Sequence, residues 1–189
     1  MRQRVSSPLK SNQLPTIIRL RQFSADWRGT MILSACPTIS RQAYGYLDII
    51  EKRPDVHVGM VVTLLEQTEI KTLGLDTLAE YLSQKGIQWF HFPIRNMDAP
   101  STSSEVILQE LIINMVKYFN ADNAVFIHCH AGLGRTGLVA ATVLKSFGMT
   151  TNAAMSAIRK KRPGSIESQI QENFVENWNF KLPDFPPRL

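Results

Sequence analysis

The sequence has little of what marks secreted, disulfide-bonded or membrane-spanning proteins. It holds only two cysteines, Cys36 and Cys129, which lie far apart, so neither a disulfide framework nor a Cys-x-x-Cys zinc site is expected. No apolar run approaches the roughly 18 residues that span a bilayer, and the N-terminus lacks the continuous apolar segment of a secretory signal. We therefore expect a cytoplasmic protein that has no transmembrane segment.

Repeats, low-complexity tracts and linkers rich in proline or glycine are also missing from the 189 residues. Hydrophobic residues make up 44% of the chain and charged residues 20%, a balance that lets one domain bury a full core. We expect residues 1–26 to form an arm, and residues 27–189 to form a single folded domain that is a monomer.

Negative charge is absent from the start of the chain, where Asp26 is the first acidic residue. The net charge is +5, and the excess lies before Asp26 in Arg2, Arg4, Lys10, Arg19 and Arg21. A basic arm can attract nucleic acid, an anionic membrane or another acidic partner. It can also be a frayed, solvated terminus without a partner.

Four apolar segments are predicted to form strands. Residues 58–65 and 124–129 are runs rich in Val, Ile, Leu and Phe, which is typical of strands that are covered on both faces. Residues 31–35 and 87–92 are the other two candidates. Residues 1–25 show no sustained periodicity, and we expect them to be irregular.

Helical patterns with recognisable ends separate and follow these strands. Thr102 and Glu105 fit a capping box for a helix over residues 106–119, and Asp76 can cap a helix that Gly86 ends. Three further helices are predicted over residues 136–147, 152–161 and 167–178. Because strands alternate with helices, we predict an α/β fold, with one central, mainly parallel sheet flanked by helices.

One segment joins a predicted buried strand to a predicted helix and concentrates the chemistry. Residues 125–137 read V-F-I-H-C-H-A-G-L-G-R-T-G, with five residues between Cys129 and Arg135. The backbone N–H groups of such a loop and the N-terminus of the helix can point into one concavity, which suits a tetrahedral dianion. Gly132 and Gly134 let the backbone approach a ligand closely.

This loop predicts a nucleophile and a cradle for phosphate. The positive field favours the thiolate form of Cys129 near neutral pH, so we expect its sulfur to attack phosphorus. The fork of Arg135 can bind two phosphoryl oxygens, and the hydroxyl of Thr136 can stabilise the departing sulfur. His128 is expected to order the loop by hydrogen bonding. The predicted phosphate-binding residues are His130, Ala131, Gly132, Leu133, Gly134 and Arg135.

The loop sequence H-C-H-A-G-L-G-R-T-G resembles the signature H-C-x5-R-[ST] of the protein tyrosine and dual-specificity phosphatase superfamily. Residues 69–74, 89–100 and 166–175 also look like parts of small dual-specificity phosphatases, above all of the cyclin-dependent-kinase-associated phosphatase group. The resemblance covers residues 27–178. It implies a protein tyrosine phosphatase-like fold that uses no metal and no other cofactor.

The resemblance also implies a general acid, which relatives carry in a loop written P-x-x-D-x-x-x-P. Here residues 93–100 read P-I-R-N-M-D-A-P, which puts Asn96 in the expected place. Asp98 is the only carboxyl group in this loop, so we predict that it is the acid; the alternative is that it only forms a turn. Gln171 matches a glutamine that positions the attacking water in many relatives, or it lies on a solvated helix face.

These expectations describe a hydrolase of phosphate monoesters. The predicted substrates are phosphotyrosine proteins, and a shallow site would also admit phosphoserine and phosphothreonine. Hydrolysis of a phosphoinositide or of an RNA 5′-phosphate is an alternative, although the loop offers His130 and Leu133 where lipid phosphatases often have lysines. A phosphate-binding module that turns over weakly, because Asn96 replaces the acid, is another alternative.

Overall fold

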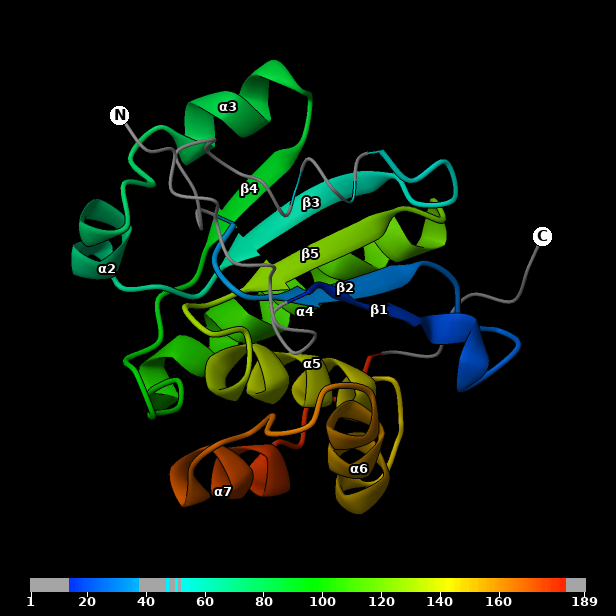
Figure 1. Cartoon of the computed structure of the whole chain (residues 1–189). Coiled ribbons are helices and arrows are strands. Elements are labelled where there is room, and N and C mark those ends of the chain that lie inside the picture. Colours follow the sequence, from blue (N-terminus) through cyan, green and yellow to red (C-terminus); the bar gives the residue numbers. More distant parts are fainter. Residues whose placement is uncertain (1–13, 38–46, 48–49, 51, 183–189) are drawn as a thin grey trace.

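The computed structural model describes residues 14–37, 47, 50 and 52–182. Within them a five-stranded sheet has the order β1-β2-β5-β3-β4 (Figure 1). Its strands are β1 (Thr16–Arg19), β2 (Thr30–Ser34), β3 (Val58–Thr63), β4 (Gln88–His91) and β5 (Ala124–His128). Strands β2 to β5 run parallel to one another, and β1 pairs antiparallel with β2. The predicted α/β fold with a mainly parallel sheet is confirmed, and the four predicted strands are β2, β3, β4 and β5.

Helices cover both faces of the sheet. Because successive strand residues point to opposite sides, each strand contributes side chains to both cores. In β5, Val125 and Ile127 face the core built with α4 (Glu105–Asn120) and α5 (Gly134–Ser146). Phe126, between them, faces the second core, which contains the apolar side chains of helices α2 (Gln67–Thr72) and α3 (Leu78–Gln84). Burial on both sides explains why this strand is apolar at every position but its last.

Helix α5 lies in the middle of the helical layer. Figure 1 shows it between the sheet and the two last helices, α6 (Thr151–Lys161) and α7 (Gln169–Asn177). Nearly all of its residues are therefore buried, including Arg135 and Thr136 in its first turn. The first turn of this helix is thus held firmly from several sides.

The N-terminal boundary of the domain differs from the prediction. Residues up to 25 were expected to be irregular, but Thr16–Arg19 forms the edge strand β1, and Ile18 and Leu20 are fully buried in the core. The predicted domain start at residue 27 is therefore wrong, since the packed domain begins at least as early as Thr16. A strand of four residues is too short to produce a periodic signal, and pairing with β2 supplies its stability. Residues 1–13 of the predicted arm lie outside the described residues.

The predicted helices are present, but two of their caps are not. Helix α3 begins at Leu78 without a side-chain cap from Asp76. Residues Thr102–Ser104 form a short 3-10 helix, η3, instead of a capping box, and α4 follows directly. Gly86 ends α3 as predicted, with a φ of 70° and the next amide bonded back to Leu82. The six-residue helix α2 was not predicted.

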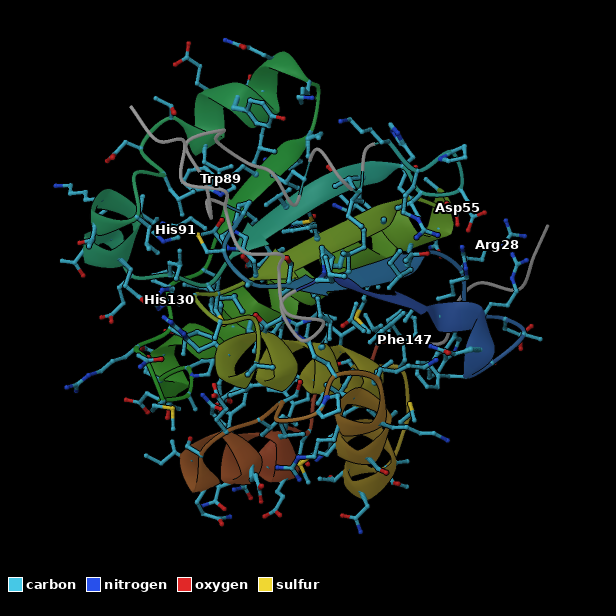
Figure 2. The ribbon with its side chains drawn as sticks, viewed as in Figure 1. Arg28, Asp55, Trp89, His91, His130 and Phe147 are labelled. Atoms are coloured by element: carbon cyan, nitrogen blue, oxygen red, sulfur yellow. The ribbon has the colours of Figure 1, made fainter. Side chains whose placement is uncertain are left out.

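Polar and aromatic side chains gather at the carboxyl ends of the parallel strands. Figure 2 shows Trp89, His91 and His130 at this end of the sheet, and Arg28 and Asp55 at the opposite end. The rings of Trp89 and His91 are stacked, with their centroids 5.5 Å apart. In sheets of this type ligands bind beyond the carboxyl ends of the strands. No helix in the described part of the chain is long and apolar enough to cross a membrane.

Candidate active site

Residues 129–135, which we call the signature loop, leave the carboxyl end of β5 and enter the first turn of α5. Cys129 follows the last residue of β5, and its side chain is buried. Its sulfur accepts a hydrogen bond from the backbone N–H of Gly132, with an N···S distance of 3.2 Å. The loop therefore curls back over the sulfur atom and presents a backbone donor to it.

Three successive carbonyl groups of the signature loop are held on its outer side. The carbonyl of His130 accepts from the backbone N–H of Cys36 at 2.9 Å. The carbonyls of Ala131 and Gly132 accept from the guanidinium of Arg162, at 3.4 and 2.6 Å. In a planar trans peptide the C=O and N–H groups point in opposite directions. Fixing these carbonyls outward therefore turns the N–H groups that follow them toward the sulfur and the concavity.

Only glycine fits at position 132. Its φ is +73°, and a Cβ atom there would lie 2.3 Å from the backbone carbonyl carbon and oxygen of Ser34. The close approach to the end of β2 is also what brings the carbonyl of His130 to Cys36. The glycine is thus required by the path of the loop and by its support from β2.

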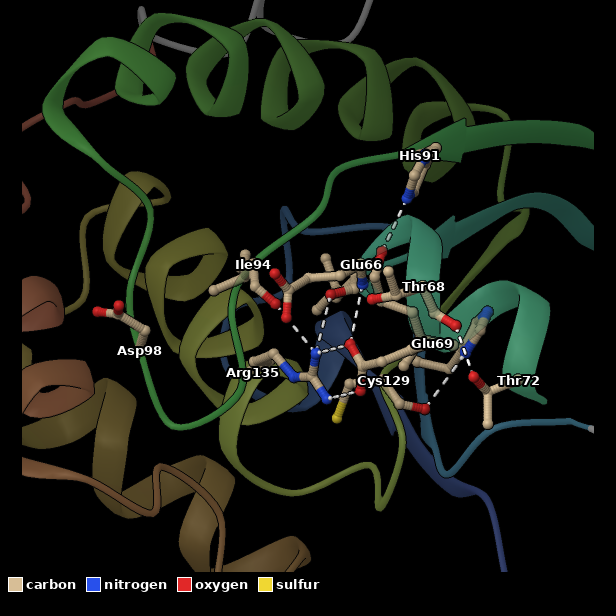
Figure 3. A network of polar contacts seen from close by, with 12 residues as sticks. Glu66, Thr68, Glu69, Thr72, His91, Ile94, Asp98, Cys129 and Arg135 are labelled. Carbon is tan, nitrogen blue, oxygen red and sulfur yellow. Dashed lines mark hydrogen bonds and ion pairs between the residues drawn. The ribbon is translucent and has the colours of Figure 1, made fainter.

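Arg135 is buried beside the sulfur and held by a carboxylate. Glu69 of α2 accepts from both terminal nitrogens, at 2.6 and 2.9 Å, and the carbonyl of Ile94 accepts at 3.0 Å (Figure 3). Burial opposes the charge of Arg135, but the hydrogen bonds that Arg135 donates to Glu69 and the charge of Cys129 outweigh it, and the pKa of Arg135 is raised. The pKa of Glu69 is lowered, since its bonds to Arg135 and the N–H of Glu66 outweigh its own desolvation. The guanidinium is therefore charged and pre-oriented.

His128 supports the base of the loop as a neutral group. It is fully buried, and burial is the main cause that lowers its pKa to about 4. Its Nε2 lies 2.7 Å from the hydroxyl of Thr63, which also accepts from the indole N–H of Trp89 at 2.9 Å. Because the indole can only donate, the hydroxyl proton of Thr63 is free to point to the imidazole. This network joins the last residues of β3 and β5 to Trp89 in β4.

Thr136 is fully buried in the first turn of α5. Its hydroxyl has no hydrogen-bond partner within the described residues. A buried hydroxyl without a partner is costly, which is compatible with a partner supplied during the reaction. Its predicted contact with the sulfur stays a prediction.

Asp98 lies in the expected loop, but its carboxyl group faces away from the nucleophile. Figure 3 shows the side chain directed away from Cys129 and Arg135. One carboxylate oxygen accepts from the N–H of Ala99 at 2.8 Å, and the N–H of Asp98 bonds to the carbonyl of Arg95. In this conformation Asp98 forms a turn, and action as an acid needs the loop to move.

Gln171 is fully buried, so the expectation of a solvated helix face is wrong. Its amide donates to the carbonyl of Asp98 at 3.2 Å and accepts from the N–H of Glu167 at 2.8 Å. The carboxylate of Glu167 in turn accepts from the N–H of Gly134 at 2.7 Å. A Cβ at Gly134 would lie 2.5 Å from that carboxylate and 3.0 Å from the Gln171 amide. Both side chains therefore lie against the signature loop.

Three residues of the site were not found by sequence reasoning, namely Glu69, Arg162 and Glu167. Glu69 lies on a helix too short to give a periodic pattern, although its segment was one of those that resembled known phosphatases. Arg162 stands beside Pro163, where the sequence signals the end of a helix rather than a site, and Glu167 begins the predicted last helix, in another segment that resembled known phosphatases. Only the tertiary fold brings them to the loop.

A protein-family model matches residues 41–149, which is more than half of the chain and includes the signature loop. The family is described as Tc-R-P, polymorphic toxin system, DSP-PTPase phosphatase. The chain belongs to this family. It is accordingly a phosphatase of the dual-specificity class within the protein tyrosine phosphatase superfamily, as the resemblance implied.

Among curated relatives, the protein tyrosine phosphatase domain-containing protein 1 of Bos taurus is 31% identical over 135 residues. The match covers 69% of this chain but only 16% of that relative, so the chain spans about a sixth of the relative's length. This likeness therefore concerns the phosphatase region alone.

Two solved structures share the fold of this DSP phosphatase. The kinase-associated phosphatase, in a variant with serine in place of its catalytic-site cysteine, has a TM-score of 0.72 and 20% identity, covering 90% of this chain and 93% of that one. PTPMT1 in complex with PI(5)P has a TM-score of 0.65 and 18% identity, covering 78% and 88%. At these identities the likeness establishes the fold and leaves the substrate open.

Proposed function

We propose that this chain hydrolyses phosphate monoesters on proteins, phosphotyrosine first, through a phosphocysteine intermediate on Cys129. The observation that carries the proposal is the hydrogen bond from the N–H of Gly132 to the sulfur of Cys129, in a loop whose carbonyls are held outward. This arrangement favours the thiolate and leaves donors for a phosphoryl group. The charged, buried Arg135 beside it supplies the positive charge that a dianion requires.

The reaction has two steps. In the first, the thiolate of Cys129 attacks phosphorus, the S–P bond forms, and the ester P–O bond breaks as an acid protonates the leaving oxygen. In the second, water attacks phosphorus, the S–P bond breaks, and inorganic phosphate leaves. The proton of the water passes to the group that acted as the acid in the first step and is now deprotonated. Throughout, the loop N–H groups and Arg135 stabilise the charge on the phosphoryl oxygens.

We propose Asp98 as the acid of the first step. Its loop is tied to the start of α7 by two hydrogen bonds, from Ser168 to the carbonyl of Met97 at 2.8 Å and from Gln171 to the carbonyl of Asp98. Met97 also has a positive φ of 61°, a conformation that costs free energy in a non-glycine residue. A loop held in this way can release its strain when it moves and carries the carboxyl group to the substrate.

A protein substrate is favoured over a multiply phosphorylated lipid headgroup. The signature loop contains no lysine that would hold additional phosphates. The carboxylate of Glu167, on the N–H of Gly134, adds negative charge beside the cradle and opposes further anionic groups. A single phosphate on a peptide meets less of this repulsion than a headgroup with several.

A panel of phosphopeptides, phosphoinositides and 5′-phosphorylated RNA tests the proposal, with Cys129→Ser as the blank. We expect turnover of phosphotyrosine peptides, and loss of nearly all turnover in Cys129→Ser and Arg135→Lys. The serine variant should still bind phosphate, since the backbone donors remain. A tenth of the wild-type rate in Cys129→Ser would refute the phosphocysteine mechanism, and preferred turnover of the lipid or RNA would refute the substrate class.

The catalytically weak phosphate-binding module is distinguished by p-nitrophenyl phosphate. Its leaving group needs little protonation, so a live nucleophile releases phosphate from it even without an efficient acid. Absence of any release, together with intact phosphate binding, would identify the binding module instead.

A further inference from the structure

Arg162 is a buried cation outside the sequence signature. It caps the C-terminus of α6, and only 3% of its surface is exposed. Two of its hydrogen bonds reach the carbonyls of Ala131 and Gly132 in the signature loop. Two others reach the carbonyl of Leu14 at 2.9 Å and the hydroxyl of Thr16 at 3.0 Å. The guanidinium thus joins the back of the loop to the start of the described chain.

A single peptide group connects Arg162 with the nucleophile. The peptide between Ala131 and Gly132 accepts from Arg162 through its carbonyl and donates to the sulfur of Cys129 through its N–H. A positive charge at the carbonyl end polarises such a group and strengthens its N–H as a donor. The hydrogen bond that this N–H gives to sulfur favours the thiolate over the thiol.

We propose that Arg162 is a positioning residue that activates Cys129 and sets phosphate affinity through the carbonyls of the signature loop. The inference rests on the proposed function and extends it to a residue that touches neither the substrate nor the sulfur. Arg162 acts in two ways. Its positive charge favours the thiolate, and its fork fixes two successive peptide groups with their carbonyls outward, so that the loop is organised before phosphate arrives.

The contacts with the N-terminal segment explain how the fork keeps its orientation. An arginine bonded to loop carbonyls alone could follow the loop when it moves. Here one terminal nitrogen is anchored on Leu14 and on Thr16, the first residue of β1, and is thereby tied to the edge of the sheet. The edge strand therefore supports the signature loop from behind, through Arg162.

Arg162→Met and Arg162→Lys test this role, with Lys145→Met as the matched control. Lys145 is also a cation that donates to two backbone carbonyls, those of Val175 and Glu176, but these lie at the end of α7. The rate of Cys129 alkylation by iodoacetate is measured against pH, together with the inhibition constant for inorganic phosphate. Circular dichroism reports folding.

For Arg162→Met we expect the midpoint of the alkylation profile to rise by roughly half a pH unit, less than a charge in direct contact causes, because a peptide group separates the guanidinium from the sulfur. Phosphate binding should weaken about tenfold in the same variant. Arg162→Lys keeps the charge but loses the fork. Its alkylation midpoint should therefore lie close to that of the wild type, while its phosphate binding should remain weakened. Lys145→Met should leave both readings at the wild-type values.

Two failures can be told apart. If wild-type protein neither turns over p-nitrophenyl phosphate nor shows phosphate protection of Cys129, the proposed function is wrong. If the wild type is active but Arg162→Met keeps the wild-type midpoint and phosphate affinity, Arg162 has no positioning role. Should the methionine variant not fold, an unchanged phosphate affinity in Arg162→Lys overturns the proposal by itself.

Discussion

Arg135 receives its orientation from residues that are distant in the sequence. Glu69 binds both of its terminal nitrogens, and the carbonyl of Ile94 binds one of them from the loop that carries Asp98. The guanidinium therefore touches both the α2 carboxylate and the loop that must move during the reaction. Its buried charge depends on Glu69, because an unpaired cation in this position would cost much free energy.

Substitution of Glu69 should therefore damage both stability and activity. We expect Glu69→Gln to lower the free energy of unfolding by about 3 kcal/mol, since it removes the charge of the half-buried carboxylate that pairs with the buried guanidinium of Arg135. We also expect kcat/KM to fall at least tenfold, because the fork of Arg135 loses its fixed direction. Urea unfolding and peptide kinetics measure the two effects. Glu80→Gln, an exposed position on the neighbouring α3, is the control, and equal behaviour of both variants would contradict the role of Glu69.

Asp98 should act as the acid although its carboxyl group faces away in this conformation. Asp98→Asn should slow phosphotyrosine hydrolysis by about 10²–10⁴-fold, the usual contribution of a general acid. The loss with p-nitrophenyl phosphate should be smaller, and the fall of kcat at high pH should disappear. Stopped-flow or steady-state kinetics with both substrates measures the difference.

Asn96→Asp provides the counter-test for the same loop. It places a carboxyl group where relatives of this class carry theirs. If Asp98→Asn is nearly neutral on phosphotyrosine while Asn96→Asp accelerates it severalfold, Asp98 is only the turn residue that its bond to Ala99 describes.

At the level of helices and strands, the sequence was informative where burial imposes a pattern. The apolar run of β5 predicted a strand because both of its faces are buried. The periodic apolar face of α4 predicted a helix because one face of it packs against the core. Strand β1 and helix α2 are too short for this, and they form because the sheet edge and Arg135 give them partners. The nucleophile could be located from local spacing, but its support from Glu69, Arg162 and Gln171 depends on tertiary contacts.

The signature loop is also limited by the space between it and β2. Gly132→Ala places a Cβ 2.3 Å from the backbone of Ser34 in a left-handed conformation, whereas Gly86→Ala meets a similar φ with no atom within 4 Å. The control, Gly86→Ala, should lower the free energy of unfolding by about 1–2 kcal/mol, which is the cost of the left-handed conformation alone. We expect Gly132→Ala to cost more and to weaken phosphate binding at least tenfold, because the loop must leave β2 and Arg162. Urea unfolding and phosphate inhibition compare the two, and equal losses would contradict a tight fit.

The complete site combines segments from nearly the full length of the described chain. Residues 14–16 anchor Arg162, β2 supports the loop, α2 supplies Glu69, the segment around Asp98 carries the proposed acid, and α7 supplies Gln171. Loss of tertiary structure therefore removes the site as a unit. Conversely, charges that are buried to build the site make the stability of the domain dependent on pH.

His128 gives this pH dependence a defined sign. Its pKa is about 4 in the folded protein, mainly because of burial, against an ordinary value of 6.5. Between these values the unfolded chain binds a proton that the folded protein does not, so stability is lost as the pH falls through this window. The expected loss from this group is about 2 kcal/mol between about pH 7 and about pH 5. The lowered pKa values of Glu69 and Asp55 affect the stability only at lower pH, because those carboxyl groups ordinarily titrate near 4.5 and 3.8.

Urea unfolding of wild type and His128→Gln at these two pH values isolates the effect. The glutamine keeps a polar group near Thr63 but cannot take up a proton. Between these two pH values the variant should therefore lose about 2 kcal/mol less of its free energy of unfolding than the wild type loses. The variant should be less stable than the wild type near pH 7 and should approach it as the pH falls. Equal losses in both proteins would mean that His128 is not a buried neutral imidazole, and the network that joins β3, β4 and β5 would need another explanation.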